Sequence, residues 1–153
     1  MSKVDERAVV PEVDAHARAR LAAALDREPV VAASLFGSQA TGRPGPLSDV
    51  DIAVWLDPAL AAADRAQTRL DLVGAAAATL DTGEVDVVIL NDAPPLLCHR
   101  AARDGRRILD REPRARVRLE TASLLEYLDT APLRATLAEG RRRRLQEGRF
   151  GRR

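Results

Sequence analysis

The stretch LFGSQATGRPGPLSDVDIAV, residues 35–54, decides how this chain folds. Two apolar segments flank a loop that opens with Gly37-Ser38 and closes with Asp49-Val50-Asp51. Side chains two positions apart in a strand share a face, so Asp49 and Asp51 point together, away from the apolar residues between them. Two carboxylates held that close repel each other, and a buried carboxylate without a partner is costly or takes up a proton. The stretch therefore predicts a strand that needs a cation beside its carboxylates.

The two ends of the loop suit the two parts of a nucleotide site. A divalent, oxygen-preferring ion such as Mg²⁺ relieves the repulsion and keeps positions open for substrate phosphates. At the other end, Gly37 allows close approach of the backbone, while Ser38 adds a hydroxyl to free N–H groups suited to phosphate. The ten residues 39–48 bring this loop back beside the aspartates. We therefore expect phosphate and metal to bind side by side.

Asp86 supplies a third carboxylate. It interrupts the apolar segment EVDVVILN, residues 84–91, where an isolated charge would again be costly. If this segment pairs beside strand 49–57, Asp86 joins the other two aspartates. Three carboxylates, two metal ions and a triphosphate form a two-metal site for in-line displacement at phosphorus. Asp86 would then help to deprotonate the attacking hydroxyl.

The rest of the chain alternates between helical and extended patterns. Strands are expected at 30–36, 49–57, 84–91 and 106–110, and helices at 12–28, from Pro58 to Leu80, at 96–104 and from Pro113 onward. In the second helix, apolar side chains keep helical spacing along one face, namely Leu70, Val73, Ala77 and Leu80. The alternation predicts an α/β or α+β fold, a small mixed sheet packed by helices.

The C-terminal part reads as a long helix. A stripe of side chains with helical spacing runs along it, namely Val117, Thr121, Leu124 and Leu128. Pro132 and Gly140 are expected to interrupt the helix before its charged end. We interpret residues 1–153 as a single domain, with a core of about 12–130 and a basic helical tail at 131–153.

Composition narrows the class of protein. The formal net charge of +1 gives no reason to expect direct nucleic-acid binding. The single cysteine, Cys98, excludes an intramolecular disulfide and fits a reducing compartment. Residues 1–10 lack the apolar core of a signal peptide, and no apolar run approaches the roughly 20 residues of a membrane helix. We therefore expect a cytoplasmic protein that does not enter the membrane.

Gly37-Ser38, ten residues and Asp49-Val50-Asp51 together resemble the GS-x10-DxD signature of the DNA polymerase β nucleotidyltransferase superfamily. Asp86 is similar to its third carboxylate, and VDVVILNDAPPLLCHRAARDGRRIL resembles the minimal nucleotidyltransferase (MNT) branch. The resemblance implies a polymerase β-type fold with a C-terminal helix. It also implies two Mg²⁺ ions on Asp49, Asp51 and Asp86, with ATP held by Gly37 and Ser38.

The resemblance also implies a partner. Many small stand-alone members resemble antitoxins that transfer AMP from ATP to a tyrosine of a HEPN-domain toxin, an RNase, and thereby silence it. One position departs from the pattern, because Thr41 stands where the family often has an arginine for the triphosphate. Arg43 follows two residues later and is the substitute that we expect to bind ATP.

Three alternatives accompany this hypothesis. An aminoglycoside nucleotidyltransferase shares the motif but generally carries a further substrate domain, for which 153 residues leave little room. A non-catalytic antitoxin would act by binding and occlusion, which the absence of the loop arginine slightly favours. In a purely structural interpretation, Asp49 lies in a turn, Asp51 faces solvent and Asp86 makes a structural ion pair.

The remaining chemically versatile side chains are expected to be structural. Trp55 and Cys98 are expected to pack in the core. His16 and His99 are expected at the surface. Tyr127 is interpreted as a packing residue, with AMP acceptor as the alternative. The run Arg141–Arg144 reads as a solvated helix end, with contact to RNA or to an acidic partner surface as the alternative.

Overall fold

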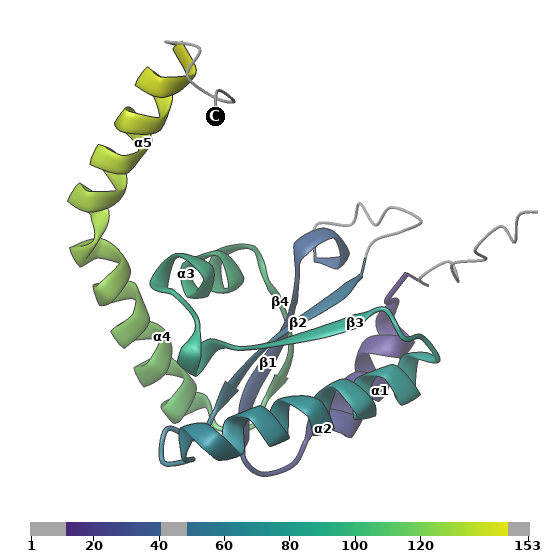
Figure 1. Cartoon of the computed structure of the whole chain (residues 1–153). Helices are drawn as coiled ribbons and strands as arrows, with labels where there is room; N and C mark the ends of the chain where they lie inside the picture. Colours follow the sequence, from purple (N-terminus) through teal and green to yellow (C-terminus); the bar gives the residue numbers. More distant parts are fainter. Residues whose placement is uncertain (1–11, 41–48, 147–153) are drawn as a thin grey trace, which may run out of the picture.

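A four-stranded mixed sheet forms the centre of the computed structural model, which describes residues 12–40 and 49–146 (Figure 1). The strands are β1 Val30–Phe36, β2 Val50–Leu56, β3 Val85–Ile89 and β4 Arg106–Asp110. Their order across the sheet is β3-β2-β1-β4. β1 is antiparallel to both β2 and β4, whereas β2 and β3 are parallel. The expected small mixed sheet is confirmed, with β4 at its edge.

Helices cover both faces of this sheet. The helices are α1 Ala15–Leu25, α2 Ala62–Leu80, α3 Pro95–Asp104, α4 Pro113–Asp129 and α5 Ala131–Gln146, and the short 3-10 turns are η1 Gly37–Gln39 and η2 Leu90–Asp92. α1 and α2 pack on one face, around Leu21, Leu25 and Leu72. α3 and the start of α4 pack on the other. α5 stands clear of the sheet (Figure 1).

The side chains of β2 contribute to a separate hydrophobic core on each face of the sheet. Val50, Ile52 and Val54 alternate into the cluster under α1 and α2, while Ala53 and Trp55 belong to the cluster under α3. This is the period of two that strand geometry imposes, applied to a strand buried on both sides. The side opposite Val50 and Ile52 is therefore where the sheet places Asp51, as the sequence predicts.

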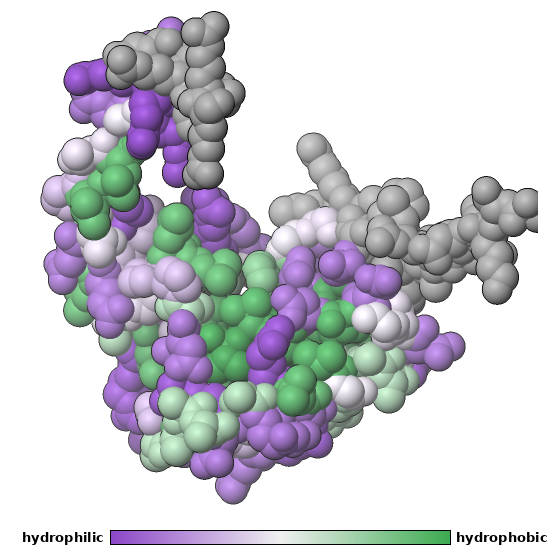
Figure 2. All heavy atoms as spheres, viewed as in Figure 1, coloured by the Kyte–Doolittle hydropathy of each residue, from purple (hydrophilic) through white to green (hydrophobic). Residues whose placement is uncertain are grey.

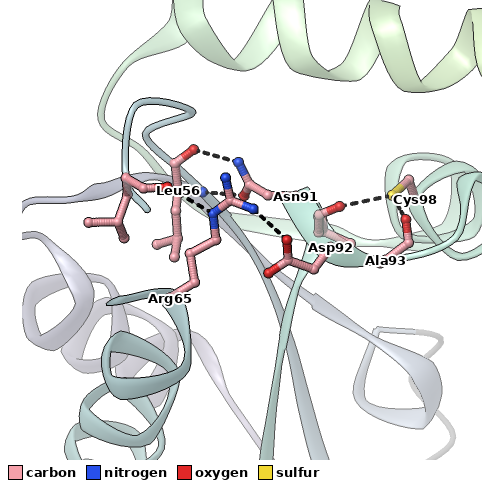
Figure 3. A network of polar contacts seen from close by, with 8 residues as sticks. Leu56, Arg65, Asn91, Asp92, Ala93 and Cys98 are labelled. Atoms are coloured by element: carbon pink, nitrogen blue, oxygen red, sulfur yellow. Dashed lines mark hydrogen bonds and ion pairs between the residues drawn. The ribbon is translucent and has the colours of Figure 1, made fainter. Parts of the chain in front are cut away.

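The carboxyl end of β2 is tied to η2 by one amide side chain. Asn91 Oδ1 accepts a hydrogen bond from the backbone N–H of Leu56 at 2.9 Å, and Asn91 Nδ2 donates to the carbonyl oxygen of Leu56 at 2.9 Å (Figure 3). Beside it, Arg65 of α2 pairs with Asp92, and the Cys98 thiol lies 3.4 Å from the carbonyl oxygen of Leu90. These contacts join β2, α2 and α3 at one point.

The start of α2 differs from the prediction. Pro58 does not open the helix but lies in a turn, and α2 begins at Ala62. The turn is held by Asp57, whose carboxylate accepts from the N–H of Ala59 at 2.9 Å and whose carbonyl oxygen accepts from Leu60 at 3.0 Å. An aspartate that bonds to the backbone two residues on favours such a turn over a helix.

The buried face of α2 also differs. Its buried residues are Leu72, Ala76 and Leu80, four positions apart, whereas Leu70 is 61% exposed. Of the predicted stripe, Leu80 is buried and Val73 packs against the core, whereas Leu70 lies on the exposed side. Since alanine and leucine recur all round α2, spacing alone could not choose the face.

The C-terminal helices differ in one respect. The helix from Pro113 ends at Asp129, and α5 begins beside Pro132, whose missing N–H cannot continue the first helix. Gly140, however, lies inside α5 and does not interrupt it. A glycine costs a helix about 1 kcal/mol relative to alanine, which is too little to end it. No helix among residues 12–40 and 49–146 is both long and apolar enough to cross a bilayer.

Candidate functional site

The candidate site lies where β1 ends and β2 begins. Phe36, the last residue of β1, faces Asp51 across the antiparallel ladder, so η1 starts beside that aspartate. Gly37 has a φ of +69°, a left-handed backbone conformation that residues other than glycine rarely adopt. A Cβ added to Gly37 would stand 2.7 Å from Asp51 Oδ2. Glycine is therefore what allows the Gly-Ser turn to press against the carboxylate.

Asp51 and Asp86 are register partners. They face each other on the parallel strands β2 and β3, so their side chains leave the same face of the sheet. The prediction that strand 84–91 pairs beside strand 49–57 is confirmed by this ladder. Asp49 precedes β2 and is exposed. The structure thus gathers Gly37, Asp51 and Asp86 at one corner of the sheet, which we call the carboxylate corner.

The environment of the carboxylate corner disfavours a negative charge on Asp51. Burial is the main cause that raises the pKa of Asp51, and the negative charges of Asp86 and then Asp49 raise it further. All three causes penalise the ionised form. A bound cation would reverse the last two, so this donor set of carboxylate oxygens fits a hard divalent ion such as Mg²⁺.

One cation is already present at this corner, and sequence reasoning missed it. Arg69 of α2 reaches around the edge strand, donating from Nη2 to Asp86 Oδ1 at 2.7 Å and from Nε to the carbonyl oxygen of Val87 at 2.6 Å. Both side chains of the ion pair are about half exposed. No local motif marks Arg69, since the contact depends on how α2 packs against β3.

The carboxylates do not form a closed metal cage. Within the described parts of the chain, no three His, Cys, Asp or Glu side chains are placed to hold one ion. Asp51 and Asp86 are brought into register, but Asp86 is engaged by Arg69 and Asp49 is solvent-exposed. The corner therefore has the ligand chemistry for a divalent ion without the finished geometry.

Gln39 is a second residue that the sequence did not single out. It is buried, and its Oε1 accepts a hydrogen bond from the N–H of Val13 at 3.2 Å, which fastens η1 to the segment before α1. Its Nε2 has no hydrogen-bond partner among the described residues. Ser38 beside it is half-buried. Thr41 and Arg43, the positions in question for the triphosphate, lie outside the described residues.

The other candidates lie away from this corner. Trp55 and Cys98 are buried in the cluster under α3, as expected, and burial raises the pKa of the Cys98 thiol. His99, expected at the surface, is instead half-buried and stacks on Tyr127 with ring centroids 4.0 Å apart. The Arg134 guanidinium lies 3.7 Å from the Tyr127 ring centroid. Tyr127 therefore packs between two side chains, in agreement with the structural interpretation.

Comparison with known proteins assigns the chain to a family. A model described as "Polymerase beta, Nucleotidyltransferase" matches residues 20–114, which include the whole carboxylate corner. No curated protein sequence matches. The match covers more than half of the chain and agrees with the expected fold class.

Solved structures share the fold at low sequence identity. A chain of a toxin–antitoxin crystal structure with AMP-PNP has a TM-score of 0.65 and 22% identity, covering 80% of this chain and 96% of that one. A chain of the toxin–antitoxin MntA–HepT has a TM-score of 0.62 and 20% identity, covering 83% and 97%. A chain from the complex of tri-AMPylated Shewanella oneidensis HEPN toxin with MNT antitoxin has a TM-score of 0.61 and 20% identity, covering 82% and 95%.

Proposed function

Since this chain belongs to the polymerase β nucleotidyltransferase family, we propose that it is a Mg²⁺-dependent antitoxin that modifies a protein. In this proposal it transfers AMP from ATP to a tyrosine hydroxyl of a partner HEPN-domain toxin in the cytoplasm and so neutralises it. The observation that carries the proposal is the register of the carboxylate corner, where Gly37 presses on Asp51 and Asp51 faces Asp86. A Gly-Ser turn of a kind suited to phosphate lies there beside two carboxylates.

The chemistry is an in-line displacement at the α-phosphorus of ATP. The acceptor oxygen forms a bond to that phosphorus, the bond to the oxygen that bridges to the β-phosphate breaks, and pyrophosphate leaves. Ser38, the backbone N–H groups of η1 and Arg43 would hold the triphosphate. Asp49, Asp51 and Asp86 would hold the Mg²⁺ ions, which supply positive charge against the phosphate oxygens. Asp86 would accept the proton of the acceptor hydroxyl.

The structural neighbours support the choice of partner. The complexes that share this fold are toxin–antitoxin pairs, one solved with AMP-PNP and one with a tri-AMPylated HEPN toxin. With TM-scores of 0.61–0.65 at 20–22% sequence identity, these structures share the fold alone, so the activity and the partner are proposed for this chain on the family match and the corner together.

Arg69 favours one alternative function. Its guanidinium makes an ion pair with Asp86, the carboxylate expected to polarise the acceptor. The second candidate is therefore a non-catalytic antitoxin that acts by binding and occlusion. The two functions differ in what happens to the partner. Transfer leaves a covalent AMP group on a tyrosine, whereas occlusion leaves the partner unmodified in a tight complex.

Intact-mass measurement of the HEPN-domain partner, incubated with this chain, ATP and Mg²⁺, tests the proposal. We expect the partner mass to rise by one or more AMP units. The variant Asp51→Asn should lower the rate by about 10²-fold or more, the size of effect seen when a key electrostatic group at a reaction centre is lost. Since repulsion and burial oppose the charge of Asp51, the variant should unfold at no lower temperature.

Asp57→Asn is the matched control, because Asp57 is an exposed aspartate at the other end of β2. It should leave the transfer rate within about twofold of the native rate. An unmodified partner bound by the native chain would replace the transferase proposal with occlusion. Full transfer by Asp51→Asn would remove the carboxylate corner from the mechanism.

A further inference from the structure

The helices α4 and α5, residues 113–146, carry most of the exposed large apolar side chains among the described residues; we call them the arm. Neither helix contains a buried residue. Seven of the nine exposed large apolar side chains among the described residues lie on it, namely Val117, Leu124, Leu125, Leu128, Leu133, Leu137 and Leu145. Figure 2 shows hydrophobic side chains at the surface of the arm. Scattered single leucines need no explanation, but a concentration of this kind marks a contact surface.

α5 in particular lacks a reason to be a stable helix on its own. It has 16 residues, and a helix of that length is marginal in water without tertiary packing. Leu133 and Leu137 are 60% and 56% exposed and lie four positions apart, on one face. A partner that covers this face would supply the packing that the other described residues do not.

α4 adds a place for an anchoring side chain. A cavity of about 380 Å³ lies between α3 and α4, lined by apolar atoms of Trp55, Val117 and Leu124 among others. Val117 and Leu124 are also about half exposed, at 51% and 43%, so the cavity opens onto the surface of the arm. Pockets of this kind hold the large apolar side chains that dominate protein interfaces.

Charge selects among possible occupants. The arm holds eight arginines and four acidic residues, a net charge of +4, whereas residues 12–40 and 49–112 hold ten arginines and sixteen acidic residues. Two arms packed against each other would bring like charges together, which disfavours pairing between copies. The exposed leucines disfavour a nucleic acid, whose phosphate backbone is bound by cationic and polar groups. The surface fits a protein that is apolar and acidic.

We propose that the arm docks a helical protein partner whose apolar stripe is flanked by carboxylates. This inference rests on the proposed function in one respect: the docked protein is the AMP acceptor. α5 and η1 extend past the same end of the sheet (Figure 1), so in this proposal a protein held by the arm reaches toward the carboxylate corner. The arm thereby raises the local concentration of acceptor hydroxyls, as a tethered second site does.

The test uses the full chain and two fluorescein-labelled peptides of about 20 residues, enough to cover α5. Both are amphipathic helices with a leucine stripe, one flanked by glutamates and one by lysines. Fluorescence anisotropy should show binding of the glutamate peptide, weakened by salt, and at least about tenfold weaker binding of the lysine peptide. The double variant Leu133→Ser/Leu137→Ser should weaken the glutamate peptide by about tenfold or more.

Leu70→Ser is the matched control, because Leu70 is equally exposed but lies on α2, and it should bind as the native chain does. Equal binding of both peptides, or an equal loss in Leu70→Ser, would overturn the proposal. Sedimentation showing self-association that the double variant abolishes would assign the arm to a second copy instead. Binding of a fluorescent ATP analogue, measured on the same samples, separates the two proposals, since docking can hold while nucleotide binding fails.

Discussion

The carboxylate corner and the arm are built by opposite means. The corner is assembled from residues far apart in the sequence, and backbone pairing of β1, β2 and β3 places Gly37, Asp51 and Asp86 together. The arm is a single run of local helix with no buried residue. The sheet therefore fixes where the carboxylates lie, whereas the arm offers exposed surface. Truncating a buried side chain of the sheet should therefore disturb the fold, whereas truncating an exposed leucine of the arm should disturb only binding.

The largest contrast is expected for leucine truncations. Leu35→Ala, in β1 just before the corner, removes a side chain that is fully buried, and we expect a loss of about 2–5 kcal/mol of unfolding free energy. Leu133→Ala, on the arm, should change it by no more than about 0.5 kcal/mol. Urea unfolding of both variants measures the difference. Equal losses would show that the arm packs within the chain.

A smaller effect on the unfolding free energy is expected at Gly37, where the backbone lies close to Asp51. Gly37→Ala places a Cβ against Asp51 Oδ2 in a left-handed backbone conformation, so we expect a loss of about 1–2 kcal/mol. Part of the loss should disappear when Asp51 is also changed to alanine, because the clashing carboxylate is gone. A double-mutant cycle by urea unfolding measures this coupling. Strict additivity would mean that backbone strain alone explains the glycine.

A small effect on stability is expected at Arg69. Because its ion pair with Asp86 is about half exposed, Arg69→Gln should change the unfolding free energy by less than about 1 kcal/mol. It should nevertheless lower the Mg²⁺ concentration required to bind an ATP analogue, since a competing cation has been removed from Asp86. A Mg²⁺ titration measures the change.

Arg65→Gln is the control for this experiment. Arg65 lies on the same helix but pairs with Asp92, away from the corner, so its loss should leave the Mg²⁺ requirement unchanged. A higher Mg²⁺ requirement in Arg69→Gln would show instead that the guanidinium orients Asp86 for metal binding.

Sequence reasoning located the corner because strand patterns are local and regular. The bounds predicted for β1 match the structure, and Asp86 was assigned to the strand that pairs with β2. Arg69 and Gln39 escaped because their contacts join distant segments and no motif marks either residue. Pro58 and Gly140 misled, since a turn at Asp57 and the low cost of one glycine outweighed the usual preferences.

The side-chain amide of Asn91 bears on how β2 is aligned in the sheet. Its two hydrogen bonds go to the N–H and the carbonyl oxygen of Leu56, so they hold one residue of β2 in place. A strand that slid by a single position would turn Asp51 into the core under α1 and α2 and move Val50 and Ile52 to the opposite face. Asn91 therefore helps to fix the alignment of β2 from the end of the strand that lies farthest from the carboxylate corner.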